Sequence, residues 1–309
     1  MGGISMEEIK KIYLIGLGGI GCAYASKLQD FDPQILKVIA DKERIDRYKK
    51  RGIIINNKEY NFNYVLPETT KEQADLIIVS VKYHNLDETI KAMKNFVNKD
   101  TIILSLLNGI SSEEVIGKEF GMEKMLYGMC VGIDAVKEDN KIRFSSTGKV
   151  NFGEKTNLIL SERVKSVKVI FEKANIPYEI PSDMIKTLWW KFMVNVGINQ
   201  VSAVLKAPYE VFNKVKEANE LMEAAMREVI ELSQKVGINL IEEDIEKFKQ
   251  ILKSLDPKNK TSMLQDIEAK RKTEVEMLGG KVCEMGEKYG VDTKVNKTLY
   301  NIIKSLEQK

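Results

Sequence analysis

The sequence contains a single histidine, His84, and only three cysteines, Cys22, Cys130 and Cys283, among its 309 residues. The cysteines are odd in number, lie far apart and show no CxxC or Cys/His spacing, which argues against a disulfide framework and against a zinc site. With one histidine, acid/base chemistry near neutral pH has to rest mainly on Lys, Glu, Asp or Tyr. We expect no metal ion, and we interpret His84 as a loop or helix-start residue.

The sequence also lacks a long apolar run and an excess of charge of one sign. Its longest apolar stretches, LIIVSV and TIILSLL, fall well short of the roughly 20 residues that span a bilayer. The opening segment MGGISMEEIKK contains acidic residues and no apolar core, so we expect no secretory signal. The 48 basic and 45 acidic residues are nearly balanced and form no block of like charges. We therefore expect a cytoplasmic protein that binds neither nucleic acid nor membrane.

What the sequence does contain is a change of pattern near residue 181. Before it, helical runs alternate with short β-rich runs at 11–15, 35–40, 76–81 and 102–106, and this rhythm predicts a parallel sheet. Segments with polar turns, such as GIIINNKEYNF, predict antiparallel additions. After Pro181 we expect long helices at 184–205, 208–236, 241–254, 263–289 and 294–307. The sequence thus predicts an α/β domain at 1–181 and an all-α domain at 182–309.

A glycine-rich loop follows the first predicted strand, in KIYLIGLGGIGCAYASKL. Gly16, Gly18 and Gly21 have GxGxxG spacing and open a helix, which is typical of a Rossmann-type dinucleotide-binding domain. The first glycine permits a tight turn, the second lets backbone approach a pyrophosphate, and the third lets helix and strand pack closely. We therefore expect the cofactor to contact the loop and the start of the helix, including Gly19 and Ile20. A merely tight turn is the simpler alternative.

The second predicted strand ends in VIADKER, where Asp41 could accept hydrogen bonds from both ribose hydroxyls of NAD. Lys42 and Arg44 follow at once, and either could pair with the 2′-phosphate of NADP. A solvated loop with no cofactor role is the structural alternative. The sequence therefore predicts NADPH or NADH, with a slight preference for NADH.

Two further polar residues follow predicted parallel strands. Lys82 comes just after the third strand and Asn108 just after the fourth, in LLNGI. Ligands in such sheets bind outside the carboxyl ends of the strands, so both side chains are placed to meet the cofactor, and Asn108 could also reach a substrate. Asn-Gly is also an ordinary turn pair, which is the alternative for Asn108.

In the C-terminal part, LWWKFMVNVGINQ places Lys191, Asn195 and Asn199 four residues apart in a predicted helix that is otherwise apolar. Residues four apart lie on one face of a helix, so the three form a row that we call the polar row. Burying an ammonium and two amides without partners would cost several kcal/mol. A bound, oxygen-rich anion would satisfy them. The alternative is a polar contact between helices.

Several stretches together resemble the ketopantoate (2-dehydropantoate) reductase family. They are GLGGIG, the segment around Lys82, LNG, LWWKFMVNVGIN, and TSMLQDIEAKRKTEVEMLGG at 261–280. The last stretch, in which LQD is followed at a fixed distance by TE, is far more specific than the glycine loop. The resemblance covers nearly the whole chain. It implies a 2-dehydropantoate 2-reductase, an oxidoreductase of pantothenate and coenzyme A synthesis that reduces ketopantoate to pantoate with NAD(P)H.

The resemblance also implies roles for individual residues. Lys191 is the catalytic lysine, and Glu274 completes the catalytic site. The residues that hold the substrate are Asn108, Asn195, Asn199 and Ser262. The chemistry agrees, because hydride transfer to a 2-keto acid leaves charge on the carbonyl oxygen, and a lysine ammonium can polarise that oxygen and protonate it. On one straight helix, however, Ser262 and Glu274 would lie about 18 Å apart, so both could not reach one small molecule.

Two positions depart from the family's usual pattern and keep other functions open. Asp41 stands where the family usually has an arginine for the NADPH phosphate, and Tyr209 stands where it often has an asparagine. Both favour a relative that reduces other branched 2-keto acids with NADH, a D-2-hydroxyacid dehydrogenase. A nucleotide-sensing protein without turnover is a further alternative, against which Lys191 and Glu274 argue. The C-terminal domain would bind substrate or mediate dimerisation, and a homodimer is compatible with its apolar positions.

Overall fold

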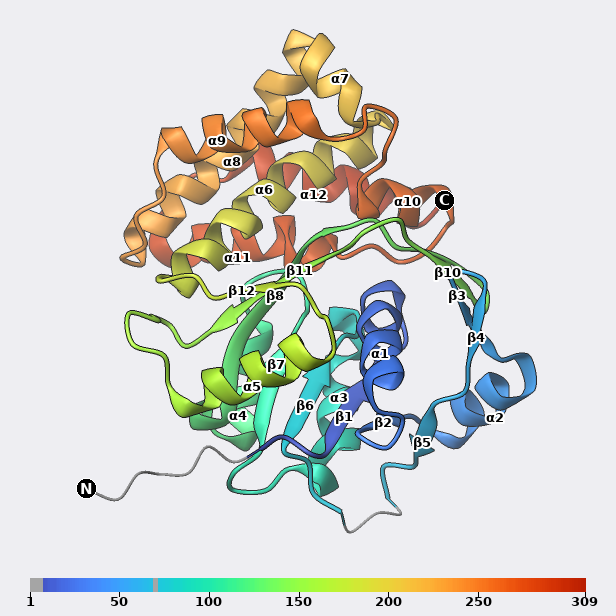
Figure 1. The fold of residues 1–309 in the computed structure, drawn as a ribbon. Helices are drawn as coiled ribbons and strands as arrows, with labels where there is room; N and C mark the ends of the chain where they lie inside the picture. Colours follow the sequence, from blue (N-terminus) through green and yellow to red (C-terminus); the bar gives the residue numbers. More distant parts are fainter. Residues whose placement is uncertain (1–7, 69–71) are drawn as a thin grey trace. The chain divides into compact units, whose positions relative to one another are not determined.

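The computed structural model describes residues 8–68 and 72–309. The chain divides into two compact units, Met1–Met184 and Ile185–Lys309, of which the first contains the sheets and the second is helical (Figure 1). The predicted fold class is thereby confirmed. Most of the segment on which we based the expectation of no secretory signal, residues 1–7, lies outside the described residues. Among the described helices, none is both long and apolar enough to cross a bilayer.

The first unit is built on a sheet of eight strands in the order β12-β11-β8-β7-β6-β1-β2-β5. Strands β5, β2, β1, β6, β7 and β8 pair in parallel, whereas β11 pairs antiparallel with β8. The three central strands, with sequences IYLI, LIIV and IILS, are buried along their whole length, as expected when helices cover both faces. The bounds are β1 Ile12–Ile15, β2 Leu36–Ile39, β5 Asn63–Val65, β6 Leu76–Val79, β7 Ile102–Ser105, β8 Met125–Ile133, β11 Thr147–Gly153 and β12 Tyr178–Glu179.

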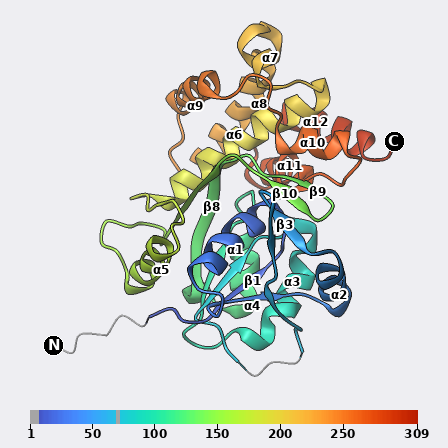
Figure 2. The ribbon, with the colours of Figure 1, turned by 45° about the vertical axis from the view of Figure 1, so that its right-hand side comes forward.

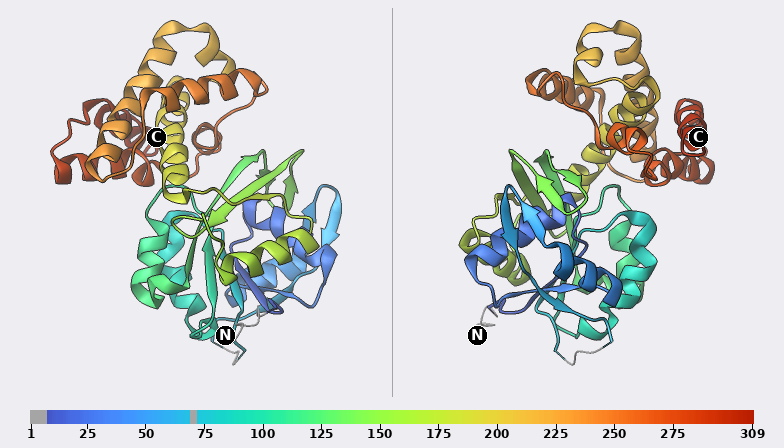
Figure 3. Two further views of the ribbon diagram at one scale, coloured as in Figure 1. Left: turned by 60° about the vertical axis from the view of Figure 1, so that its left-hand side comes forward. Right: turned by 90° about the vertical axis from the view of Figure 1, so that its right-hand side faces the viewer.

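Helices cover both faces of this sheet. Figure 3 shows α1 (Gly19–Phe31) and α5 (Glu162–Lys173) on one face, and α3 (Leu86–Met93) and α4 (Ser112–Phe120) on the other. Two separate apolar clusters match these layers, because α1 and α5 contribute to one cluster and α3 and α4 to the other. The helical runs predicted between the strands therefore form the outer layers of an α/β/α sandwich.

A second, smaller sheet has the strand order β4-β3-β10-β9. It joins two antiparallel hairpins from distant parts of the sequence, and β10 pairs in parallel with β3. Figure 2 shows this sheet beside α1, which contacts β3 and β10. The first hairpin contains the predicted antiparallel segment GIIINNKEYNF, whose turn residues Asn56 and Asn57 both have positive φ. The bounds are β3 Ile53–Ile55, β4 Lys58–Tyr60, β9 Val136–Glu138 and β10 Lys141–Arg143.

The second unit consists of helices, and two of the predicted long helices are wrong. The expected helix 208–236 is broken at Val215, which has an extended backbone, and the expected helix 263–289 ends at Glu268. No proline or glycine lies at Val215, so the sequence did not mark the first break. The second break contains the charged run EAKRKTE at 268–274, shortly before Gly279 and Gly280. Lys270 has a positive φ in the second break. The bounds are α6 Met184–Leu205, α7 Tyr209–Lys214, α8 Lys216–Lys235, α9 Glu242–Ser254, α10 Ser262–Glu268, α11 Gly279–Tyr289 and α12 Lys294–Leu306.

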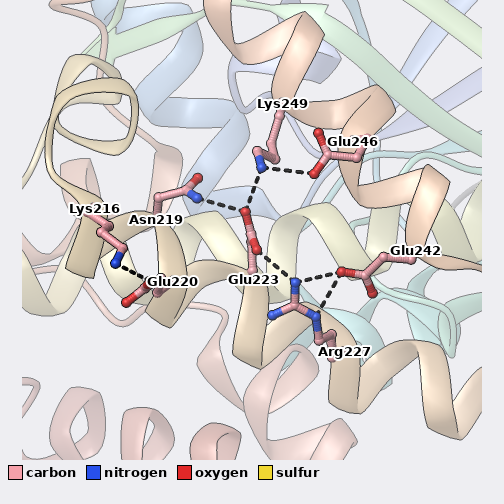
Figure 4. A network of polar contacts seen from close by, with 8 residues as sticks. All are labelled: Lys216, Asn219, Glu220, Glu223, Arg227, Glu242, Glu246 and Lys249. Carbon is pink, nitrogen blue, oxygen red and sulfur yellow. Dashed lines mark hydrogen bonds and ion pairs between the residues drawn. The ribbon is translucent and has the colours of Figure 1, made fainter.

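A buried carboxylate links α8 to α9 (Figure 4). Glu223 accepts hydrogen bonds from Asn219 at 2.7 Å and Arg227 at 2.8 Å, and it pairs with Lys249 of α9 at 2.8 Å. Burial alone would raise the pKa of Glu223, but its bonds to Lys249, Arg227 and Asn219 hold that pKa below the usual value. The network therefore explains why an acidic residue is buried here and gives it a structural role.

Candidate functional site

Four candidate cofactor residues lie at the carboxyl ends of strands of the main sheet. Strands β7, β6, β1 and β2 are adjacent and parallel, and their last residues are direct neighbours in the register. Gly16, Lys82 and Asn108 follow three of these ends, and Asp41 follows the fourth. The chain passes from β1 to β2 on one side of β1 and later returns to β6 on its other side. The residues thus surround the point where the strand order reverses, where such sheets bind nucleotides.

The three motif glycines differ in the space around them. Gly16 has a φ of +103°, and a Cβ there would lie 2.6 Å from the carbonyl oxygen of Ser80. A Cβ on Gly21 would lie 1.9 Å from the carbonyl oxygen of Gly16. A Cβ on Gly18 would meet only the Ser80 carbonyl oxygen, at 4.0 Å. The first and third glycines are therefore required by the fold itself, whereas Gly18 leaves open space at the start of α1.

This loop fits the diphosphate group of a dinucleotide. Gly18 is the N-cap of α1, and it supplies no side chain to cap the helix. The backbone of Gly19 and Ile20 therefore begins the helix next to the open space, at the positive end of the helix dipole. The sequence analysis did not identify Ser80, whose hydroxyl donates to the Gly16 carbonyl oxygen at 2.8 Å and holds the loop in place. The sequence feature that could have pointed to Ser80 is a small residue directly after β6.

Asp41 has a structural role that the sequence did not reveal. It is the N-cap of α2 (Lys42–Arg51), where its Oδ1 accepts from the Arg44 backbone N–H at 2.7 Å. Its Oδ2 lies 3.1 Å from Arg44 Nη1. Lys42 pairs instead with Asp46 at 3.2 Å, on the exposed side of the helix. The carboxylate assigned to the ribose therefore also caps a helix and holds an arginine beside it.

Lys82 and Asn108 follow their strands in short irregular segments. Lys82 is half-buried and directly precedes a 3-10 turn, Tyr83–Asn85, which includes the exposed His84. Asn108 is also half-buried, and Gly109 has a φ of +94°, which is typical of an Asn-Gly turn. The backbone thus places both residues at the carboxyl ends of the parallel strands, where the glycine loop also lies.

A buried polar cluster that the sequence analysis missed supports the segment containing Asn108. Ser105 and Ser112 share a hydrogen bond of 2.7 Å, and Ser112 Oγ donates to Glu113 Oε2 at 2.9 Å. Glu113 is only 2% exposed, and burial raises its pKa to about 7. From sequence it resembles any acidic residue in the first turn of a helix. Only its packing beneath the loop distinguishes it from the exposed Glu114.

The polar row lies on α6 as predicted from its spacing. Lys191 and Asn195 are half-buried, and Asn199 is buried with 8% of its surface exposed. The other faces of the helix carry buried apolar side chains such as Phe192 and Val196. The amine and the two amides therefore share one face of α6, which also carries other polar side chains, among them the buried Gln200 and Ser202.

Ser262 is the first residue of α10 and is exposed. The residue before it, Thr261, caps α10 by accepting from the Leu264 N–H, and its hydroxyl donates to Ser202 Oγ of α6 at 3.0 Å. The loop before α10 is therefore attached to α6, three residues beyond Asn199. Because α10 ends at Glu268, Ser262 and Glu274 do not lie on one straight helix, and the separation calculated for that helix does not apply.

Glu274 is half-buried and directly precedes the 3-10 turn Val275–Met277. Its neighbour Thr273 donates from its N–H to Glu307 Oε1 at 2.8 Å and from its hydroxyl at 2.5 Å. Upstream, Asp266 pairs with Arg271 at 2.9 Å across the end of α10. Two residues of the LQD and TE motif, Asp266 and Thr273, therefore shape the backbone on either side of the loop that leads to Glu274.

Comparison with known proteins identifies the family. The profile described as ketopantoate reductase PanE/ApbA matches residues 12–157, and the profile for the C-terminal part of the same family matches residues 183–307. The chain belongs to the ketopantoate reductase family. This is a family of NAD(P)-dependent oxidoreductases that act on CH–OH groups.

The similar proteins of this family extend over nearly the whole chain. The 2-dehydropantoate 2-reductase of Aquifex aeolicus is 26% identical over 97% of both chains. That of Pyrococcus horikoshii is 28% identical over 96% of this chain and 97% of its own. Among solved structures, D-mandelate dehydrogenase with NADH and anilino(oxo)acetate has a TM-score of 0.87 at 23% identity, covering 96% of this chain and 98% of its own. A ketopantoate reductase from Ralstonia eutropha has a TM-score of 0.82 at 19% identity, with the same coverages. These likenesses to solved structures show the fold.

Among the described residues of this family member, no group of three or more His, Cys, Asp or Glu side chains is arranged to hold a metal ion. The structure brings together the candidate cofactor residues at the carboxyl ends of four adjacent strands of the main sheet. In the helical unit it links the start of α10 to α6, and it places Glu274 in a separate segment anchored to α12 through Glu307.

Proposed function

We propose that the chain is a 2-dehydropantoate 2-reductase that reduces the keto group of ketopantoate to give pantoate. The observation that supports this proposal most is the polar row on α6, in a chain whose two parts match the two family profiles. An ammonium and two amides in an apolar helix suit a small, oxygen-rich acid better than a hydrophobic ligand. We further propose that the enzyme is cytoplasmic and acts in pantothenate and coenzyme A synthesis.

The proposed chemistry assigns one role to each polar residue. The bound cofactor supplies a hydride to the carbonyl carbon. Lys191 polarises the carbonyl oxygen and donates the proton that the developing alkoxide requires. Glu274 orients the Lys191 ammonium or a substrate hydroxyl. The remaining hydroxyl and carboxylate oxygens of the substrate are bound by Asn108, Asn195, Asn199 and Ser262.

On the cofactor side, we propose that the diphosphate is bound by the backbone from Gly16 to Gly21, including Gly19 and Ile20. Lys82 and Asn108 contact the nicotinamide half. Asp41, Lys42 and Arg44 face the adenosine ribose and influence the choice between NADPH and NADH. The steric difference between Gly18 and its two motif partners supports the first of these assignments.

The decisive experiment is a matrix of kcat/KM values, with NADH and NADPH each tested against ketopantoate, 2-ketoisovalerate and 2-ketoisocaproate. We expect ketopantoate to give the highest kcat/KM with either cofactor. A higher value for another keto acid would contradict the substrate proposed here. Cofactor binding without turnover of any of the three acids would contradict an enzymatic role for this site.

One alternative rests on a specific observation. The fold resembles D-mandelate dehydrogenase with NADH at a TM-score of 0.87, and Tyr209, whose pKa is raised by burial, occupies a position where the family often has an asparagine. This alternative is an NADH-dependent D-2-hydroxyacid dehydrogenase for other branched keto acids. Highest activity on 2-ketoisovalerate or 2-ketoisocaproate with NADH would select this alternative.

A solved relative is described as dimeric. We propose that this chain also forms a homodimer, which analytical ultracentrifugation can test.

A further inference from the structure

The proposed mechanism leaves one buried carboxyl group unused, that of Glu113 in the first turn of α4. Only 2% of Glu113 is exposed, and it follows Asn108 closely in the sequence, across the short loop that joins β7 to α4. A buried carboxyl group is costly to ionise, so each hydrogen bond around it bears on its protonation state.

A chain of hydrogen bonds connects this carboxyl group to the backbone beside Asn108. Ser112 Oγ donates to Glu113 Oε2 at 2.9 Å and shares a hydrogen bond of 2.7 Å with Ser105 Oγ. The Leu107 N–H in turn donates to Ser105 Oγ, at the longer distance of 3.4 Å. Because a carboxylate can only accept, ionisation of Glu113 fixes one direction for this chain, with every N–H and O–H donating toward the carboxylate.

Protonation of Glu113 removes that constraint. A neutral carboxyl group carries an O–H that can donate to Ser112 Oγ, so the order of the two hydroxyls can reverse. The negative charge that polarises the chain is also lost, and hydrogen bonds to an ionised group are about twice as strong as neutral ones. The Leu107 N–H, and with it the backbone that orients Asn108, is therefore held more firmly when Glu113 is ionised.

The start of α4 depends on the same carboxylate. Ser111 is the N-cap residue, but its side chain makes no capping hydrogen bond, and its buried hydroxyl has no partner among the described residues. Hydrogen bonds from the backbone N–H groups of Glu113 itself and of Gly128 on β8, the latter at 3.5 Å, favour the ionised carboxylate. The ionised side chain thus supplies an acceptor at the helix start where Ser111 supplies none.

The groups around Glu113 leave both of its forms accessible. Burial raises its pKa to about 7, and the charge of Glu114 on the same helix acts in the same direction. Burial, and then the charge of Glu113, raise the pKa of Tyr127 on β8. Lys94 after α3 and Lys124 in the turn after α4 each pair with a different glutamate, at 3.8 and 3.3 Å. Near neutral pH, a small contribution from a ligand therefore changes the ratio of the two forms.

We propose that Glu113 is a positioning residue for Asn108, and that the chain with ionised Glu113 binds the nicotinamide cofactor more tightly, so that binding releases a proton. This inference rests on the proposed function only in assigning Asn108 to the cofactor. Glu113 acts through the loop and does not itself touch the ligand. A ligand that prefers the ionised form lowers the pKa of Glu113 in the complex, and the proton passes to the buffer.

The test measures NADH binding by the full chain without any turnover. Isothermal titration calorimetry from pH 6 to pH 8 gives the affinity, and buffers with different ionisation enthalpies give the number of protons released. We expect the parent to bind NADH roughly three- to tenfold more tightly at the upper pH than at the lower, which corresponds to about one hydrogen bond. At pH 7 it should release up to about half a proton, because the free carboxyl group is half-protonated there.

Variants separate this role from a purely structural one. Glu113→Gln stays neutral, so its NADH affinity should equal that of the parent at low pH and stay constant, with no proton released. Ser112→Ala keeps the carboxyl group but interrupts its link to Ser105, and should reduce the pH dependence to less than about twofold. Glu114→Gln, at the exposed neighbouring position, is the matched control, and His84→Gln removes the single histidine. Both should keep the pH dependence of the parent.

Three results would overturn the inference. An NADH affinity of the parent that stays constant or falls as pH rises would show that the ionised form is not the tighter binder. A pH dependence that persists in Glu113→Gln would make Glu113 a purely structural residue, and one that disappears in His84→Gln would assign the proton to the histidine. None of these results contradicts a reductase. If the linked proton release is observed while no keto acid is reduced, the proposed function fails and this inference stands.

Discussion

The glycine loop and the polar row show two different ways to build a candidate site. The loop is made of backbone: its glycines are required where a Cβ would meet another main-chain atom, as at Gly16 and Gly21. The polar row is made of side chains on α6, and the residues proposed to complete it come from the start of α10 and from the segment before Val275. The first kind of site depends on local shape. The second depends on connections between distant segments.

The difference predicts which substitutions each region tolerates. In the loop, even a methyl group is too large at some positions, and the damage extends to the fold. In the polar row, side chains can be truncated while the helix remains, so the damage is confined to chemistry. Variants that separate stability from activity therefore test the comparison directly.

The largest effect is expected for Lys191→Ala. If Lys191 supplies the proton, kcat for ketopantoate should fall by roughly 10²- to 10⁴-fold, because that is the usual contribution of a positioned acid. Unfolding by urea should show a stability close to that of the parent. Lys206→Ala, an exposed lysine directly after the same helix, is the control and should keep full activity. A decrease in kcat of less than about tenfold would show that another group donates the proton.

The second effect compares two glycines of one loop. Gly21→Ala places a Cβ 1.9 Å from the Gly16 carbonyl oxygen and should lower the free energy of unfolding by about 3 kcal/mol or more. Gly18→Ala meets only open space, so its free energy of unfolding should stay within about 1 kcal/mol of the parent. Its cofactor affinity should still fall by about tenfold, if a diphosphate occupies that space. Urea titration and calorimetry measure the two quantities, and similar stability losses in both variants would contradict the steric distinction.

The smallest effect concerns Glu113, where a buried side chain rather than backbone shape supports a segment of the first unit. Its pKa in the folded state is about 7, whereas an unperturbed glutamate side chain has a pKa of 4.5. As pH rises from 4.5 to 7, the unfolded chain releases this proton and the folded chain keeps it. The parent should therefore lose up to about 3 kcal/mol of stability over that range.

Glu113→Gln cannot release a proton. The free energy of unfolding of the variant, relative to that of the parent, should therefore increase as pH rises from 4.5 to 7 and should not change further above pH 7. Urea titrations at several pH values measure this difference. Glu114→Gln, at the exposed neighbouring position, should follow the parent. Identical pH profiles for the parent and Glu113→Gln would show that Glu113 is not the buried group that holds the proton.

Much of the fold could be predicted, and the failures share a cause. The strands and the glycine loop were predictable because apolar β-rich runs and glycine spacing act over a few residues. The break at Val215 was not, since no proline or glycine lies there and Val215 is only a moderately weak helix former. Glu113 and Ser80 were missed because their surroundings come from other elements of the sheet domain. Which of the candidate residues touch a ligand remains a prediction that the proposed variants test.

By itself, the sequence determined the α/β order of elements, the glycine loop and the spacing of Lys191, Asn195 and Asn199 along one helix face. These follow from backbone sterics and helical periodicity, which depend on neighbouring residues alone. Only the tertiary structure decided that Asp41 caps α2 while holding Arg44, and that Lys137 contacts Leu17 from 120 positions away. Such contacts depend on how hairpins and helices pack, and no local pattern records that packing.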